Sequence, residues 1–129
     1  LLHGHTFTAN PLACAVAHKS LELFQEEMTL KKIAHIEQKH SDFLKVLVSC
    51  DSVCKLRKIG SIMAFDIKSK DGNYKNSLSE KLRFLFLSKG FNIRPIGSTV
   101  YLMPPYCISD KDLDKTYSVI LETINSLSL

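Results

Sequence analysis

The sequence lacks the features that mark membrane, disordered and repeat proteins. It has no internal repeat, no low-complexity segment and no apolar run near the roughly 18 residues that a transmembrane helix needs. Hydrophobic residues make up 45% of its 129 residues and charged residues 23%, a balance typical of a soluble globular protein. The length fits one ordinary domain with a sizeable core.

The chain also has little excess charge. Its formal net charge is +4, and its densest basic cluster, Lys55, Arg57 and Lys58, has no interleaved aromatic residues. A platform for single-stranded nucleic acid would combine the two kinds of side chain. We therefore interpret the cluster as the solvated edge of a strand, and we expect neither a nucleic-acid nor a membrane partner.

Cysteine is sparse and dispersed. The cysteines are Cys14, Cys50, Cys54 and Cys107. Cys50 and Cys54 could join His3 and His5 in a zinc site, but the spacing lacks the second compact pair of a zinc module, so we expect no metal. Free thiols indicate a reducing compartment, and the predicted location is the cytoplasm.

The start of the chain shows neither an initiating methionine nor the basic segment that opens a signal peptide. A motif able to carry chemistry also lies within its first residues. We therefore expect the chain to be a C-terminal piece of a longer protein.

Hydrophobic periodicity and capping residues predict four helices and three strands. The predicted helices run from Asn10 to about Glu27, from Thr29 to about Leu47, from Ser77 to the stop at Gly90, and from Ser109 onward; the predicted strands are one within 59–68 and a hairpin of 91–94 with 100–103. Capping boxes mark the last two helices. His40 falls on the apolar stripe of the second helix, so we expect an interior, hydrogen-bonded histidine rather than a ligand.

The predicted order is helix, helix, strand, helix, strand, strand, helix. This order indicates an α+β (α/β two-layer) fold, in which helices cover a small, mostly antiparallel sheet.

The first candidate site is HGHTFTANPLACAVA, which starts at His3. His3 and His5 could bind a metal, although no carboxylate or third histidine lies near. Gly4 and the hydroxyls of Thr6 and Thr8, ahead of a helix, could instead hold an anion such as a phosphate. The segment could also be a plain polar loop into a capped helix. The residues alone leave all three interpretations open.

The second candidate site is IRPIGSTVYLMPPY, residues 93–106. Arg94 lies at the end of a predicted strand and Pro95 restricts the backbone beside it. A guanidinium held in this way can bind a carboxylate through two parallel hydrogen bonds. The alternative is a surface arginine that pairs with an acidic neighbour.

Taken together, HGHTFTANPLACAVA and IRPIGSTVYLMPPYCIS resemble the C-terminal part of the class III, fold-type I, pyridoxal-phosphate-dependent aminotransferases. The resemblance runs over essentially the whole chain, and the two motifs in this order are more specific than either alone. The second motif is most similar to the members of the family that act in biotin biosynthesis.

The resemblance implies roles for five residues. Thr6 is expected to bind the phosphate of pyridoxal 5'-phosphate across the interface of a homodimer, with His5 beside it, although some relatives have proline where His5 stands. Gly4 is expected near the substrate. Arg94 is expected to bind the carboxylate of 8-amino-7-oxononanoate, with Tyr101 close to that site.

The resemblance places the catalytic lysine outside this sequence. The lysine that holds the cofactor as a Schiff base lies before Leu1 in the family's order, and no lysine of this chain matches it. The fragment is therefore expected to have no catalytic residue of its own and to be inactive alone.

The implied reaction of the intact enzyme transfers the amino group of S-adenosylmethionine to 8-amino-7-oxononanoate and gives 7,8-diaminononanoate. Another class III aminotransferase, acting on an ω-amino acid, a diamine or an amine, is the first alternative. A non-catalytic metal-binding or dimerisation module is the second.

The resemblance also implies a division of the chain. Residues 1–27 would be the edge of the large cofactor domain and a connecting helix, and residues 28–129 the small C-terminal domain. Without its partner domain, the first segment is expected to expose Leu12, Val16 and Leu21.

Overall fold

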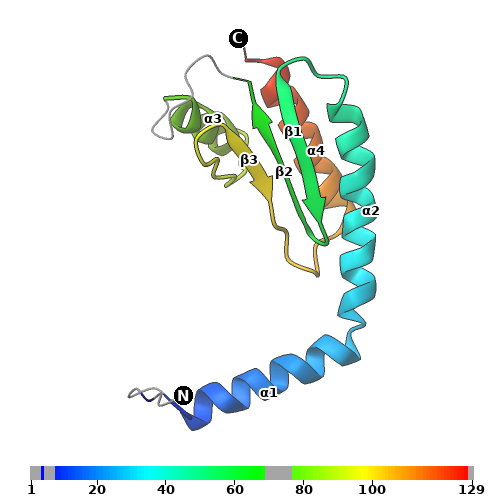
Figure 1. The fold of residues 1–129 in the computed structure, drawn as a ribbon, viewed down its shortest axis with the longest axis vertical. Coiled ribbons are helices and arrows are strands. Elements are labelled where there is room, and N and C mark those ends of the chain that lie inside the picture. Colours follow the sequence, from blue (N-terminus) through cyan, green and yellow to red (C-terminus); the bar gives the residue numbers. More distant parts are fainter. Residues whose placement is uncertain (1–3, 5–7, 69–76, 128–129) are drawn as a thin grey trace.

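The computed structural model describes residue 4 and residues 8–68 and 77–127. The elements are α1 (Pro11–Glu26), α2 (Thr29–Leu47), β1 (Val53–Ile59), β2 (Ile62–Ile67), α3 (Ser77–Ser88), β3 (Thr99–Leu102) and α4 (Asp110–Asn125). Figure 1 shows α1 as an arm that extends from the end of α2, while the other helices gather around the sheet. No helix in the described residues is long and apolar enough to cross a bilayer.

The sheet is antiparallel and has the order β1-β2-β3. Its register pairs Met63 with Leu102 and Phe65 with Val100, and all four side chains are buried. They belong to one core with α2, α3 and α4, to which the helices contribute Ile36, Phe43, Leu47, Leu82, Phe86, Leu113, Ile120 and Ile124. Burial of this apolar area stabilises the fold by roughly 25 cal/mol per Å². The α+β prediction is confirmed.

The predicted helices and most of their ends are also confirmed. Asn10 Oδ1 accepts hydrogen bonds from the N–H groups of Leu12 and Ala13, at 3.0 and 3.1 Å, which caps α1. Ser109 Oγ accepts one from the N–H of Asp112 at 3.1 Å and caps α4. α3 begins at Ser77 as predicted, but the side chain of Ser77, on which that capping box depends, lies outside the described part.

The predicted order of strands is wrong at β1, which precedes β2 and pairs with it. Apart from Val53, its residues are partly or fully exposed, so the strand lacks the apolar alternation that would reveal it. Its ladder is also irregular. The register shifts between Cys54 and Arg57, and Lys55 has a positive φ of 51°.

The predicted hairpin is wrong in its first strand, since residues 91–94 form no strand. What remains of the hairpin is a single bridge between Ile96 and Thr99 across the turn Gly97-Ser98, with Gly97 at a φ of 58°. Ile93 is 7% exposed, so contact with the core rather than strand pairing fixes this segment.

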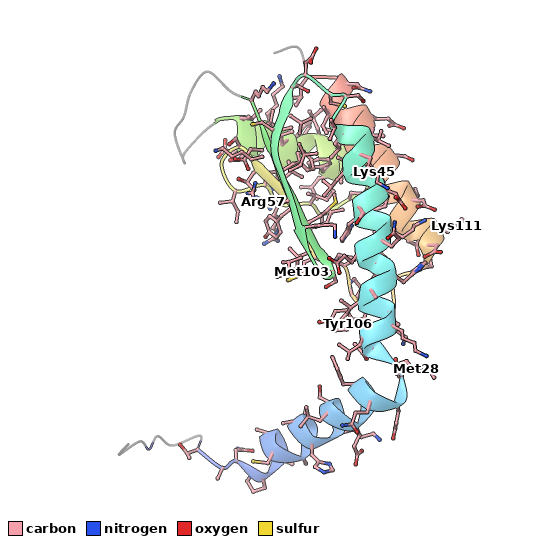
Figure 2. The ribbon with its side chains drawn as sticks, turned by 45° about the vertical axis from the view of Figure 1, so that its right-hand side comes forward. Met28, Lys45, Arg57, Met103, Tyr106 and Lys111 are labelled. Atoms are coloured by element: carbon pink, nitrogen blue, oxygen red, sulfur yellow. The ribbon has the colours of Figure 1, made fainter. Side chains whose placement is uncertain are left out.

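Helix α1 buries none of its residues. Leu12, Val16 and Leu21 are 79%, 71% and 68% exposed, which confirms the predicted apolar surface. The elbow between α1 and α2 lies at Met28, which has a φ of 50° (Figure 2). An ion pair of 2.6 Å between Lys32 Nζ and Glu27 Oε2 crosses the elbow. Within the described residues, α1 therefore adds no buried side chain to the core.

Candidate functional site

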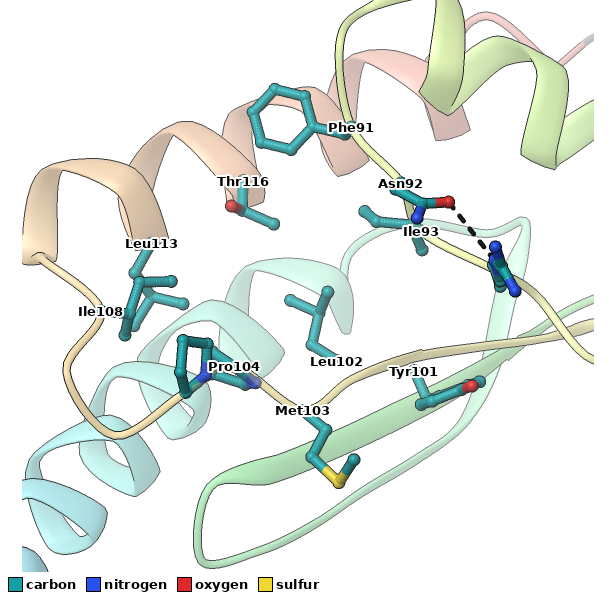
Figure 3. A pocket seen from close by; sticks show the side chains of 12 residues that line it. Phe91, Asn92, Ile93, Tyr101, Leu102, Met103, Pro104, Ile108, Leu113 and Thr116 are labelled. Atoms are coloured by element: carbon teal, nitrogen blue, oxygen red, sulfur yellow. Dashed lines mark hydrogen bonds between the residues drawn. The ribbon is translucent and has the colours of Figure 1, made fainter.

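A pocket of about 360 Å³ lies beside β3, between the segment that follows α3 and the start of α4. Its lining comprises Phe91, Asn92, Ile93, Arg94, Tyr101, Leu102, Met103, Pro104, Pro105, Ile108, Leu113 and Thr116. Figure 3 shows that these side chains come from three places in the chain: the 91–94 segment, β3 with its exit, and α4. The size is within the range of small-molecule sites, about 300–1,000 Å³.

The end of α3 directs the chain into this pocket. Gly90 has a φ of 83°, and its N–H donates to the carbonyl of Leu87 at 2.9 Å while that of Phe91 donates to Phe86 at 2.9 Å. This is the Schellman arrangement, which glycine adopts without strain. The stop predicted at Gly90 is therefore confirmed, and it places residues 91–94 against the sheet edge.

Arg94 is the cationic side chain of the pocket lining. Its Nε donates a hydrogen bond of 3.4 Å to Asn92 Oδ1, which is dashed in Figure 3. The described part of the chain provides no partner for its two terminal nitrogens, and the residue is exposed. The Nη groups therefore remain available to bind an acidic group as a fork.

Tyr101 lines the same pocket as Arg94. The N–H groups of Ile96 and Thr99 each donate to the other residue's carbonyl at 2.9 Å, which closes the two-residue turn between them. Arg94 lies two residues before this bridge and Tyr101 two residues after it, although residues 91–94 form no strand. The structure thus brings these two predicted site residues together.

The other predicted site residues lie at the far end of the chain. His5 and Thr6 lie outside the described residues. So does Leu1, the residue before which the family's order places the Schiff-base lysine. Gly4 is exposed, and a Cβ atom at its position would meet no described residue within 4 Å. Figure 1 shows that the N-terminal end of α1 points away from the sheet. The described residues of the first motif therefore take no part in the pocket beside β3.

An acidic residue that the sequence reading left without a role lies on the outer face of the sheet. Asp66 is 8% exposed. Its Oδ1 accepts hydrogen bonds from Thr99 Oγ1 at 2.8 Å and from both Nη atoms of Arg57 at 3.2 Å, and Lys55 Nζ lies 3.2 Å from Oδ2. Burial raises the pKa of Asp66, but the hydrogen bonds from Thr99, Lys55 and Arg57 outweigh it and hold this pKa below its usual range.

This arrangement refines the interpretation of the basic cluster. Lys55 and Arg57 do lie on an exposed strand, yet both are partners of Asp66 rather than isolated charges. Lys58 pairs across to Glu37 on α2 at 2.8 Å. An aspartate on the outward side of the mainly apolar β2 was the signal that could have revealed this group.

Metal-ligating side chains do not gather in the described residues, where no group of at least three histidine, cysteine or acidic residues could hold an ion. The cysteines are all free. His40 is buried with hydrogen bonds at both ring nitrogens, which confirms its predicted interior role. His3 and His5, the other members of the zinc alternative, lie outside the described part.

Comparison with known protein families gives a match to the family described as aminotransferase class-III, over residues 1–124. Among curated proteins, the chain is 34% identical over 125 residues to the adenosylmethionine-8-amino-7-oxononanoate aminotransferase of Synechococcus elongatus. The match covers 97% of this chain and 29% of that protein. The same-named protein of Corynebacterium glutamicum is 38% identical over 106 residues, which are 82% of this chain and 24% of the relative. The chain thus spans less than a third of the length of these relatives.

Solved structures show the same likeness. The adenosylmethionine-8-amino-7-oxononanoate aminotransferase of Methanocaldococcus jannaschii superposes with a TM-score of 0.88 at 28% identity, over 100% of this chain and 31% of that one. The acetylornithine aminotransferase of Elizabethkingia anophelis gives a TM-score of 0.84 at 27% identity, over 98% of this chain and 33% of that one. The helices and the three-stranded sheet therefore match a C-terminal part of such structures.

Proposed function

Since the chain belongs to the class-III aminotransferase family, we propose that it is the C-terminal part of an enzyme that transfers the amino group of S-adenosylmethionine to 8-amino-7-oxononanoate. The product would be 7,8-diaminononanoate, in biotin biosynthesis. The observation that carries the proposal is the pocket beside β3, where a guanidinium whose terminal nitrogens have no partner among the described residues stands among apolar side chains. The names of the similar proteins from Synechococcus and Corynebacterium support the choice of substrates.

The pocket suits an acceptor that has a carboxylate at one end and an aliphatic chain. Arg94 would bind the carboxylate through its two Nη groups, because a planar fork matches both carboxylate oxygens. Tyr101 and Met103 from the strand side and Ile93 from the other side would contact the aliphatic chain. Arg94 would thus act in positioning and specificity, and a guanidinium, which stays protonated in proteins, would not transfer a proton.

The family uses pyridoxal 5'-phosphate, which supplies an electron sink for the transfer of the amino group. Thr6 would bind its phosphate through the hydroxyl and backbone N–H, and His5 would lie beside it. Gly4 fits this role in one respect: no neighbour among the described residues requires a glycine there, whereas a bound dianion would favour a backbone without bulk. The residues before Leu1 would supply the lysine that holds the cofactor.

The exposed arm suggests how the intact enzyme is built. Residues 1–27 would belong to the edge of the large cofactor domain and its connecting helix, and residues 28–129 to the small domain. In a homodimer, Thr6 of one subunit would reach the cofactor of the other. The enzyme would act in the cytoplasm, where free cysteines such as Cys14 and Cys107 persist.

The test uses the intact protein that contains this chain, purified and supplied with pyridoxal 5'-phosphate. We expect a yellow protein that converts 8-amino-7-oxononanoate to 7,8-diaminononanoate when S-adenosylmethionine is the amino donor, as mass spectrometry would show. A protein that stays colourless with the cofactor would refute the aminotransferase proposal as a whole. A protein that binds the cofactor but does not accept S-adenosylmethionine would refute the choice of amino donor.

A second candidate is an aminotransferase that acts on an ω-amino acid, a diamine or an amine. The likeness to the Elizabethkingia acetylornithine aminotransferase favours it, since the identity there is 27%, close to that of the Methanocaldococcus structure. The two candidates differ in the amino donor. Turnover with acetylornithine or a diamine, and none with S-adenosylmethionine, would select the second.

A further inference from the structure

The turn that separates Arg94 from Tyr101 is bound to the rest of the sheet at two points. The carbonyl of Ser98 accepts a hydrogen bond of 2.9 Å from the N–H of Ile67. The hydroxyl of Thr99 donates one of 2.8 Å to Asp66 Oδ1. Both contacts lead to β2, so the position of the turn depends on β2 and on the carboxylate that β2 carries.

Asp66 is in turn held from the other side. Arg57 donates from both Nη atoms to the same Oδ1, at 3.2 Å, and it comes from β1. One buried carboxylate oxygen thus collects hydrogen bonds from β1 and β3, the two neighbours of its own strand. Charge-assisted hydrogen bonds of this kind are about twice as strong as neutral ones. The side chain of Asp66 therefore links all three strands near its pairing with Thr99.

The hydrogen bond between Thr99 and Asp66 lies close in sequence to the pocket residues Arg94 and Tyr101. Thr99 is the first residue of β3 and Tyr101 is two residues further on, while Arg94 is two residues before Ile96, the bridge partner of Thr99. A shift of Thr99 would therefore move Tyr101 and Arg94 relative to each other. Such a displacement would weaken binding of the acceptor, because a bidentate fork needs both of its hydrogen bonds aligned.

We propose that Asp66 and Thr99 are positioning residues for the carboxylate site: their hydrogen bond sets the spacing of Arg94 and Tyr101. This inference rests on the proposed function. Arg57 and Lys55 complete the arrangement because they neutralise Asp66, whose unpaired negative charge would repel an incoming carboxylate. With both ion pairs formed, the group carries no uncompensated negative charge.

Thr99→Val in the intact aminotransferase tests the proposal, since valine keeps the branched shape and removes the hydroxyl. We expect the KM for the carboxylate-bearing acceptor to rise about tenfold, with little change in kcat. The KM for the methyl ester of the same acceptor should stay within about twofold, because the ester does not need the guanidinium fork. Thr99→Ser, which restores a hydroxyl, should restore the KM, and Ser98→Ala serves as the matched control in the same turn.

An equal rise in KM for the acid and the ester, or no rise for either, would overturn the proposal. A second measurement on the 129-residue chain does not depend on activity. Amide exchange of Ile96 and Ile67, which donate to Thr99 and Ser98, should become about tenfold faster in Thr99→Val and stay unchanged in Ser98→Ala. If amide exchange is unchanged in Thr99→Val, the hydrogen bond between Thr99 and Asp66 does not hold the turn, and the proposal is refuted. If the wild-type enzyme is inactive, the proposed function is refuted, but the exchange measurement still tests whether this hydrogen bond holds the turn.

Discussion

The Nδ1 atom of His40 and the hydroxyl of Tyr117 lie 2.7 Å apart in the core and join α2 to α4. The other ring nitrogen, Nε2, lies 3.0 Å from the carbonyl oxygen of Ser61 and must donate to it. Nδ1 is then the acceptor for the tyrosine hydroxyl, so this arrangement needs a neutral imidazole. Phe43, also on α2, stacks on Tyr117 with 4.3 Å between ring centroids.

The buried state of His40 should make folding sensitive to mild acid. Burial lowers the pKa of His40 and Lys58 adds to this, while the Ser61 carbonyl and Glu37 oppose it. The unfolded chain therefore takes up a proton below about pH 6.5 that the folded chain resists. The free energy of unfolding should fall as the pH drops from 7.5 to about 5, measured by urea denaturation. His40→Gln, which cannot titrate, should lose this dependence; an unchanged slope in that variant would refute it.

The Ser109 cap of α4 should contribute measurably to the free energy of unfolding. Ser109 Oγ accepts from the N–H of Asp112, and its hydroxyl also donates to Asp112 Oδ2 at 2.7 Å. Ser109→Ala should lower the free energy of unfolding by about 1 kcal/mol. Ser118→Ala is the matched control, because Ser118 is an exposed residue inside the same helix and alanine is a better helix former there. Equal losses in both variants would show that the cap contributes nothing specific.

The arm formed by α1 should be the least protected helix of the isolated chain. It buries none of its residues, whereas α4 buries seven. Local opening therefore costs α1 little. Amide exchange followed by NMR should be about a hundredfold faster or more at Val16 than at Ile120. Similar protection of the two helices would mean that contacts beyond those described here hold α1.

Loss of the guanidinium in the intact enzyme should separate the two half-reactions. Arg94→Ala should lower kcat/KM for the carboxylate-bearing acceptor by about tenfold to a hundredfold, because the acid group loses its fork. The half-reaction with S-adenosylmethionine should change much less, as single-turnover spectroscopy would show. Arg94→Lys, which keeps the charge without the fork, should lie between these limits. An equal loss in both half-reactions would reject a role specific to the acceptor.

The N-terminal motif can be tested through the cofactor alone. Thr6→Val in the intact protein should weaken binding of pyridoxal 5'-phosphate by about tenfold, because one hydrogen bond to a dianion is lost. Absorbance or fluorescence titration measures this affinity. Thr8→Val separates the family-based role from a general polar loop, since only Thr6 is expected to bind the phosphate. An affinity that is unchanged by Thr6→Val would rule out the phosphate role.

The sequence predicted the helices well because their signals are local. Asn10 and Ser109 cap the helices as expected, Gly90 ends α3, and the stripe of α2 faces the core through Ile36 and Phe43. The strands were harder to predict. β1 pairs with β2 and has only one buried side chain, that of Val53, so no apolar periodicity marks it in the sequence.

In the candidate site, too, the sequence reveals relationships between residues close in the chain and misses those between distant ones. Arg94 and Tyr101 line one pocket because a short turn links them, and their roles there are predictions from family resemblance. Asp66 could not be placed beforehand, because its partners Arg57 and Thr99 lie 9 and 33 positions away in the sequence. The roles of His5 and Thr6, and the position of the cofactor lysine before Leu1, remain predictions from family resemblance.

The irregular ladder of β1 has a consequence for how the molecule meets other chains. An exposed edge strand offers unpaired backbone groups on which foreign strands can grow, and natural sheets blunt such edges with bulges and lysine. In β1 both devices coincide, since Lys55 has a left-handed backbone where the pairing slips. The irregular backbone and Lys55 therefore protect the edge of β1 against pairing with strands of other chains. This protection does not depend on α1.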